Sequence, residues 1–312
     1  MSAVGLGGGF AADALLGDPP RLHPVAGFGR VASAAERLGY APSRARGALY
    51  AATLVLGAAL FAELATRACE RTRLGRGGAL ALSTWTALGG RSLARAARRL
   101  GRSLDAGDLD RARQALPALC GRDASELDCA DLSRAAVESV AENTADAVVG
   151  ALFWAALAGP AGVVAYRAAN TLDAMVGYRD ERYASFGWAA ARLDDVLSWP
   201  GARLTAALAI ALAPLVGGSP RPALRVALRD GPEHPSPNAG LVEAAFAGAL
   251  GLRLGGPLAY GGRAEVRATL GDGRAPAAAD IERAIRLSTA VGVASAALAT
   301  CARAVVVRRR RP

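Results

Sequence analysis

The stretch GALYAATLVLGAALFAELAT at positions 47–66 decides the fold class of this chain. Glu63 is its one charged residue, and about twenty apolar residues are what an α-helix needs to cross the hydrocarbon core of a bilayer. The lipid core offers no water to backbone amides, so a crossing segment must satisfy them internally as a helix. We therefore expect a transmembrane helix over 47–66.

Further apolar stretches lie at 287–307, 145–166, 204–217 and 79–90. The second of these contains Gly159-Pro160, where we expect a kink or a break. The third is short enough to be half-buried or re-entrant. Alternation of β-branched residues is scarce, so the sequence predicts an all-α, polytopic integral membrane helical bundle with about four or five spans. A soluble, alanine-rich helical protein is the alternative.

Residues 1–312 are expected to form a single membrane-embedded helical domain that carries a soluble amphipathic insertion at 91–138. In the insertion, apolar residues recur at helical spacing with charges on the other face, which predicts two amphipathic cytoplasmic helices separated near Gly107. The Gly- and Pro-rich stretch 217–240 is expected to be a loop.

Composition excludes several classes of chemistry. The chain has 37 basic residues, all of them arginine, and a net charge of +10. Without lysine there is no Walker A loop, Schiff base or PLP enzyme. The four cysteines never form CxxC, so reduced thiols are expected. Aromatics are sparse and the arginines do not follow one amphipathic element, so we expect no nucleic-acid partner.

The two ends of the chain bear on its topology. Asp13 interrupts the apolar N-terminal stretch, which also lacks a basic region, so no cleavable signal is expected. The arginine run 308–311 directly follows the last apolar stretch. Under the positive-inside rule this run places the C-terminus in the cytoplasm.

Three acidic residues at helical spacing open the polar centre of the chain. Glu138, Glu142 and Asp146 follow one another at i, i+4 and i+8, which places them on one helix face, where like charges repel. A bound cation such as Mg²⁺ would relieve this repulsion. Asn143 extends the polar face. The alternative is a solvated helix end just outside the membrane.

The next polar groups surround a loop between two predicted helices. Asn170 and Asp173 are spaced i, i+3 and precede the charged and aromatic stretch 177–183. Arg179 and Arg182 could hold a phosphate or carboxylate through bidentate contacts, although a membrane-surface loop anchored by tyrosines is the alternative.

Farther along, Arg192 precedes the adjacent pair Asp194 and Asp195. Two adjacent residues of a helix cannot face the same way, so we expect at most one of this acidic pair to share a ligand with its neighbours. Proline-rich turns surround His23 and His234, and each of these histidines is expected to be structural rather than catalytic.

Four motifs in order resemble the CobD/CbiB family of cobalamin biosynthesis. They are DALLGDPPRLHPV (13–25), ESVAENTADAVV (138–149), NTLDAMVGYRDERYASFGWAAARLDD (170–195) and HPSPNAG (234–240). The resemblance implies a multi-pass enzyme of the bacterial inner membrane with a cytoplasmic active site. Its reaction would join adenosylcobyric acid to (R)-1-aminopropan-2-ol phosphate, or to aminopropanol, giving adenosylcobinamide phosphate.

The same resemblance implies an ATP-dependent carbon–nitrogen ligase that uses Mg²⁺. Its partners would be the corrinoid, aminopropanol phosphate and the lipid bilayer, with other membrane-associated corrinoid-pathway enzymes as candidates. We assign the catalytic core to Glu142, Asp146 and Asp173. We assign the metal to Glu138, Asp194 and Asp195. The residues assigned to substrate binding are Asn143, Asn170, Tyr178, Arg179, Glu181, Arg182, Arg192 and Asn238.

Two other functions stay open. An AmpE-like inner-membrane sensor would share the multi-span architecture, and a small-solute transporter would also place acids within spans. The block NTLDAMVGYRDERY together with HPSPN favours the enzyme. No internal inverted symmetry, which would favour a transporter, is visible in the sequence.

Overall fold

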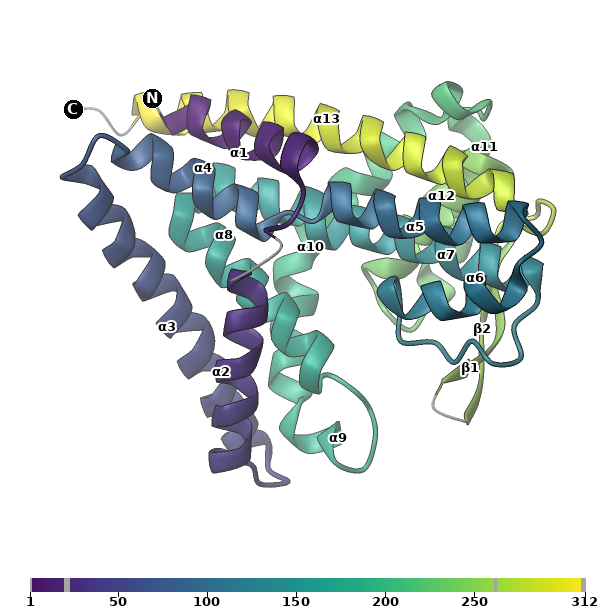
Figure 1. The fold of residues 1–312 in the computed structure, drawn as a ribbon, viewed down its shortest axis with the longest axis horizontal. Coiled ribbons are helices and arrows are strands. Elements are labelled where there is room, and N and C mark those ends of the chain that lie inside the picture. The colour runs from purple at the N-terminus through teal and green to yellow at the C-terminus, as the bar shows by residue number, and fades with distance from the viewer. Residues whose placement is uncertain (1, 20–22, 261–262, 310–312) are drawn as a thin grey trace. The chain divides into compact units, whose positions relative to one another are not determined.

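The structure, a computed structural model, describes residues 2–19, 23–260 and 263–309, and it is predominantly helical (Figure 1). The α-helices are α1 (Ser2–Leu16), α2 (Pro24–Gly39), α3 (Arg44–Glu70), α4 (Gly75–Ala87), α5 (Gly90–Asp105), α6 (Leu109–Ala115), α7 (Cys129–Thr144), α8 (Gly150–Val176), α9 (Tyr183–Phe186), α10 (Trp188–Ala211), α11 (Pro220–Asp230), α12 (Ala239–Leu250) and α13 (Ala278–Arg309). The short turns are η1 (Leu116–Ala118), η2 (Ala145–Val149), η3 (Ala213–Val216) and η4 (Gly231–Glu233). The predicted all-α membrane fold is confirmed.

The chain divides into two compact units. Unit 1 holds the described residues of Met1–Gly89, Asp146–Gly201 and Ser295–Pro312, and unit 2 holds Gly90–Ala145 and Ala202–Ala294. The predicted insertion at 91–138 therefore lies within unit 2. That 1–312 forms one membrane-embedded domain stays a prediction.

Three segments are long and apolar enough to cross a membrane, by length and composition, in the part of the chain that the structure describes. They are Arg44–Glu70, Cys129–Val176 and Ala278–Arg308. The predicted helices over 47–66 and 287–307 lie inside the first and the last of these. The stretch 79–90 contributes only the short helix α4, and residues 310–311 of the arginine run lie outside the described residues.

One core of unit 1 forms where α1 packs on α4 and α4 packs on α8 (Figure 1). Its centre includes Leu6, Leu80, Leu152 and Tyr166, each at most 1% exposed. Small residues allow this close approach: a Cβ added to Gly5 would lie 2.2 Å from the Gly77 carbonyl oxygen. The glycine-rich start of the sequence is therefore a helix-packing surface.

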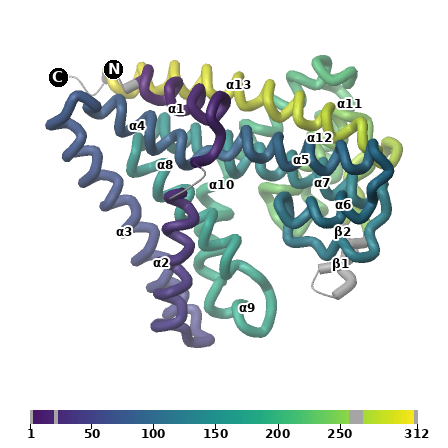
Figure 2. The backbone as a smooth tube through the Cα atoms, viewed as in Figure 1, coloured from purple at the N-terminus to yellow at the C-terminus, as the bar shows by residue number. Residues whose placement is uncertain are grey.

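A second core of unit 1 lies along α3, which packs against α8 and α9 (Figure 2). The ring of Phe186 lies between those of Tyr40 and Tyr50, with centroid distances of 5.2 Å and 5.0 Å. The Tyr50 hydroxyl donates to the Ala32 carbonyl at 3.2 Å, which ties α3 to α2. This core holds the loop before α9 against the ends of two long helices.

The expected kink at Gly159-Pro160 is confirmed. Gly159 has φ 70° and ψ −150° inside α8. A positive φ is strained for residues with a Cβ, and Pro160 lacks the N–H that would continue the helical ladder. Just before α8, the chain forms the π-helical turn η2, which contains Asp146. Such π-turns inside helices are frequent at functional sites.

Unit 2 contains the two amphipathic helices that the sequence predicts. Gly107, at φ 71°, separates α5 from α6, as expected. The prediction that 217–240 is a loop is wrong in part, because α11 occupies Pro220–Asp230. Prolines in a first helical turn cost little, since the N–H groups there have no partner within the helix.

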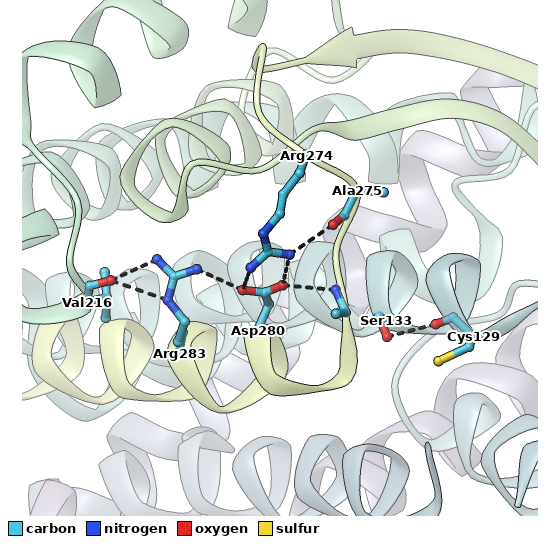
Figure 3. Close-up of polar contacts among 8 residues, drawn as sticks. Cys129, Ser133, Val216, Arg274, Ala275, Asp280 and Arg283 are labelled. Atoms are coloured by element: carbon cyan, nitrogen blue, oxygen red, sulfur yellow. Dashed lines mark hydrogen bonds and ion pairs between the residues drawn. The ribbon is translucent and has the colours of Figure 1, made fainter. Parts of the chain in front are cut away.

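Unit 2 also contains the antiparallel hairpin of β1 (Leu254–Tyr260) and β2 (Arg263–Leu270). The sequence reading did not anticipate these strands. Beside them, Asp280 is fully buried at the start of α13 and accepts from Arg274, Arg283 and the Ala277 N–H at 2.7–2.9 Å (Figure 3). Arg283 also donates to the Val216 carbonyl, so this network ties α13 to η3.

Candidate active site

The predicted site residues divide between the two units. Unit 1 holds ten of them: Asp146, Asn170, Asp173, Tyr178, Arg179, Glu181, Arg182, Arg192, Asp194 and Asp195. Unit 2 holds the other four: Glu138, Glu142, Asn143 and Asn238.

Asn170 joins two carboxylates in unit 1. Its side-chain Nδ2 lies 3.4 Å from Asp146 Oδ2 and 3.3 Å from Asp194 Oδ1. Asn170 comes from α8, Asp194 from α10 and Asp146 from the π-turn η2. An amide has two N–H donors, so one asparagine can serve two carboxylates at once. Three residues that are far apart in sequence thus form one polar group.

The adjacent aspartates have different surroundings, as their positions on a helix require. Asp194 is buried and also accepts from the Ser198 hydroxyl at 3.3 Å. Asp195 is partly exposed and pairs with Arg192 at 3.1 Å. Burial, and next the negative charge of Asp173, raise the pKa of Asp194 to about 7. A carboxyl with that pKa exchanges a proton near neutral pH.

The π-turn is held in place by a buried tyrosine. Tyr166, which is 1% exposed, donates from its hydroxyl to the backbone carbonyl of Asp146 at 3.1 Å and lies 3.4 Å from the Ser198 hydroxyl. The ring leaves no room for a side chain at Gly150, where an added Cβ would lie 2.3 Å from the tyrosine hydroxyl. Tyr166 therefore positions Asp146 without itself being acidic or basic.

The loop between α8 and α9 contains two kinds of arginine. Arg182 donates to Glu36 at 2.9 Å, and its guanidinium lies 4.4 Å from the centre of the Tyr40 ring. Arg179 is exposed and has no ion-pair partner among the residues that the structure describes. Tyr178 and Glu181 are exposed beside it. Arg182 therefore stabilises the loop through its contacts with Glu36 and Tyr40, whereas the side chain of Arg179 is accessible to a ligand.

In unit 2, Glu138 is buried in an ion pair. Its Oε2 accepts from Arg122 at 2.6 Å, with the two side chains 6% and 3% exposed, and its Oε1 accepts from the Gly255 N–H at 2.7 Å. Both oxygens are thus engaged with protein donors. The structure places the assigned metal ligand Glu138 in the contact between α7 and the hairpin.

The remaining candidate residues of unit 2 differ in their exposure. Glu142 is exposed near the end of α7. Asn143 donates to the Ser139 carbonyl at 2.9 Å. Asn238 is buried and accepts from Arg203, a residue of α10 that sequence reasoning did not single out. Burial lowers the pKa of Arg203.

The acids of unit 1 suit a metal that arrives with its substrate better than a resident one. No group of three His, Cys, Asp or Glu side chains among the described residues could hold a metal ion. Mg²⁺ commonly binds through one or two carboxylates together with substrate phosphates. Asp146, whose Oδ2 accepts from Asn170, could supply one such carboxylate.

Sequence reasoning missed the residues that organise this group. Tyr166 and Ser198 lie within or beside the quoted motifs, but a single tyrosine or serine carries no spacing signal. Arg167 is different, because an arginine inside an apolar segment is expensive and is usually functional. Its Nη1 donates to Asn170 Oδ1 at 2.9 Å. The position of Arg167 inside an apolar segment was therefore the sequence signal that could have identified it as a site residue.

Comparison with known proteins decides the family. The family model described as "CobD/Cbib protein" matches residues 6–288. The chain belongs to the CobD/CbiB family. Among curated members, Cobalamin biosynthesis protein CobD of Mycobacterium tuberculosis (strain ATCC 25618 / H37Rv) is 51% identical over 310 residues, covering 99% of this chain and 97% of that protein.

More distant family members match over most of their length. The CobD protein of Pelobacter propionicus is 45% identical, covering 83% of this chain and 82% of that protein. That of Chromobacterium violaceum is 44% identical, covering 88% of each. No solved structure matches the chain.

Proposed function

We propose that this chain forms the amide bond between a carboxylate of adenosylcobyric acid and the amine of (R)-1-aminopropan-2-ol phosphate, or of aminopropanol. The product would be adenosylcobinamide phosphate, or adenosylcobinamide with the unphosphorylated amine. The chain acts in cobalamin biosynthesis as a biosynthetic enzyme, as its membership of the CobD/CbiB family indicates. The observation that carries the chemical assignment is the pair Asp146 and Asp194 joined by Asn170.

Amide formation from a carboxylate at neutral pH needs an activated acyl group. In the proposed reaction, ATP transfers its γ-phosphoryl group to the corrinoid carboxylate, which releases ADP and leaves an acyl phosphate. The amine nitrogen then attacks the acyl carbon, and phosphate leaves. The attacking ammonium must give up a proton, which a nearby carboxylate can accept.

Asp194 has the properties that this base requires. General-base catalysis is most efficient when the pKa of the base lies near the working pH, because the base is then both strong and largely unprotonated. Burial raises the pKa of Asp194 to about 7. Asn170 and Ser198 direct hydrogen bonds to one oxygen of the carboxylate. We therefore move Asp194 from the predicted metal ligands to the role of base.

The other acids and the exposed arginine have complementary roles. Mg²⁺, when bound with the nucleotide, would neutralise charge on the phosphoryl group, and Asp146 would hold it. Arg179 would contact a phosphate or a propionamide edge of the corrinoid. Asp173 lies close enough to Asp194 for its charge to affect that carboxyl, which helps to keep Asp194 protonatable.

The proposed topology places this chemistry in the cytoplasm. Arg308 ends the last candidate span, and the sequence continues with further arginines. Basic residues beside a span are retained on the cytoplasmic side. This asymmetry supports a bacterial inner-membrane location with a cytoplasmic C-terminus, and we propose that the active site faces the same side.

The reaction can be tested with purified protein in detergent. Adenosylcobyric acid, aminopropanol phosphate and Mg-ATP are supplied, and ADP and adenosylcobinamide phosphate are followed in parallel. Equal rates of appearance of the two products support an ATP-dependent ligase. Asp194→Asn is the test variant, because it removes the proposed base. Arg73→Met is its control, because Arg73 is an exposed arginine in the turn after α3. No product with either linker amine would refute the proposal.

A further inference from the structure

A cleft in unit 1 has no role in the chemistry described so far. Its volume is about 380 Å³, which includes space open to the surroundings, and it is lined by residues of α2, α3, α4 and α8. Most of the lining is apolar, including Phe28, Ala58 and Val164. Arg167 is the one charged residue among the side chains that line it.

Arg167 is placed in this cleft without a counter-ion. It lies in the candidate span Cys129–Val176, and no ion pair between described residues includes it. Its Nη1 donates to Asn170, but its Nε is buried and has no hydrogen-bond partner. A buried guanidinium donor without an acceptor costs free energy, and a bound ligand is one way to supply that acceptor.

The remaining polar groups of the cleft are complementary to a small ligand. The hydroxyls of Thr86 and Thr171 donate to the helix carbonyls of Leu82 and Arg167, at 3.0 Å and 2.7 Å. Their lone pairs are left to accept from an N–H or O–H group of a ligand. Pro24 and Val25 also line the cleft. They begin α2, whose N-terminal end favours an anion.

We infer that this cleft binds a small phosphate monoester with a short apolar body and a hydrogen-bond donor, and that Arg167 binds its phosphate. The edge of a guanidinium formed by Nε and Nη2 matches two phosphate oxygens in a bidentate contact. The Nη1 bond to Asn170 leaves Nε and Nη2 without an acceptor among the described residues. The apolar wall accommodates the carbon chain, and the threonine hydroxyls accept from the donor group.

The contact between Arg167 and Asn170 connects the cleft to the proposed catalytic carboxylates. Arg167 donates to Asn170, and Asn170 donates to Asp146 and Asp194. In this chain of hydrogen bonds, only Asn170 stands between the arginine that would hold the ligand and the proposed base, Asp194. This inference rests on the proposed function, because it identifies the cleft as the place where the phosphorylated linker amine binds.

Binding can be measured without turnover. Aminopropanol phosphate and inorganic phosphate are titrated into the full-length protein in a phosphate-free detergent by calorimetry. Arg167→Met is expected to weaken the binding of aminopropanol phosphate roughly 10- to 100-fold, the range for a lost charge-assisted hydrogen bond. Arg167→Lys is expected to be intermediate. Ala58→Leu, which narrows the cleft from α3, should also weaken binding, whereas Arg73→Met should match the parent.

The outcomes separate this inference from the proposed function. If Arg167→Met and Ala58→Leu bind aminopropanol phosphate as tightly as the parent, or turn over with an unchanged KM for it, the cleft is not its site, although the ligase can stand. If binding depends on Arg167 but no amide forms, the ligase fails and the site stands. If only phosphatidylglycerol in nanodiscs binds in an Arg167-dependent way, the cleft holds a lipid headgroup and the inference is wrong.

Discussion

Asn170 Nδ2 lies 3.3 Å from Asp194 Oδ1, and this hydrogen bond joins α8 to α10. The donor is a neutral amide that also serves Asp146 and accepts from Arg167. One side chain thus connects a cation and two carboxylates inside a mainly apolar unit.

Asp194→Asn should abolish most amide formation and stabilise the protein at alkaline pH. The pKa of Asp194 rises from 3.8 in the unfolded chain to about 7 in the fold, chiefly through burial. The folded state therefore loses stability as pH rises from about 4 to about 7, and the loss persists above that range. The variant lacks this loss, so its advantage in unfolding free energy should be on the order of 4 kcal/mol at pH 8 and vanish near pH 4.

Thermal unfolding in detergent at the two pH values measures this difference. Asp195→Asn is the matched control, since Asp195 is partly exposed and ion-paired with Arg192. An Asp194→Asn advantage that is equal at both pH values would contradict a raised pKa.

Asn170→Asp should reduce kcat more than Asn170→Ala. The aspartate keeps the shape but replaces the N–H donors with acceptors, which places a third negative charge beside Asp146 and Asp194. Like charges at this distance disfavour ionisation of their neighbours. Steady-state kinetics across pH 6–9 test the idea, and the pH–rate profile of Asn170→Asp should shift to higher pH. Parental kcat in both variants would remove Asn170 from the site.

Arg122→Met should destabilise unit 2 strongly. It leaves Glu138 buried and without its cation, and breaking a buried pair costs about 3–5 kcal/mol. The double variant Arg122→Met with Glu138→Gln should recover part of that loss. Denaturation of the single and double variants gives the coupling energy. If Glu138→Gln instead keeps full stability and loses Mg²⁺-dependent activity, Glu138 is a metal ligand as first assigned.

The two loop arginines should affect different quantities. Arg179→Met should raise KM for the corrinoid and leave thermal stability unchanged, because Arg179 is exposed and has no ion pair among the described residues. Arg182→Met should lower the thermal midpoint slightly through loss of its contacts with Glu36 and Tyr40. Kinetics and thermal unfolding of both variants test this division, and a reversed pattern would refute it.

Local patterns predicted much of the architecture. The long apolar runs, the kink at Gly159 and the break at Gly107 all follow from properties of neighbouring residues. The loop predicted at 217–240 was wrong where α11 forms, because proline in a first turn resembles a loop signal in sequence. The hairpin was missed because its strands are few and stabilised by pairing with each other.

The sequence by itself determined the helical membrane fold class and collected the polar residues of the site into a few motifs. The hydropathy pattern of a helix depends only on residues that are close in sequence, so it can be recognised without knowledge of the fold. Only the tertiary structure decided which polar groups meet. Glu138 and Arg122 pair with each other, while Asp146 and Asp194 share Asn170. These contacts depend on how the helices pack against one another, so they cannot be predicted from the spacing of residues along the chain.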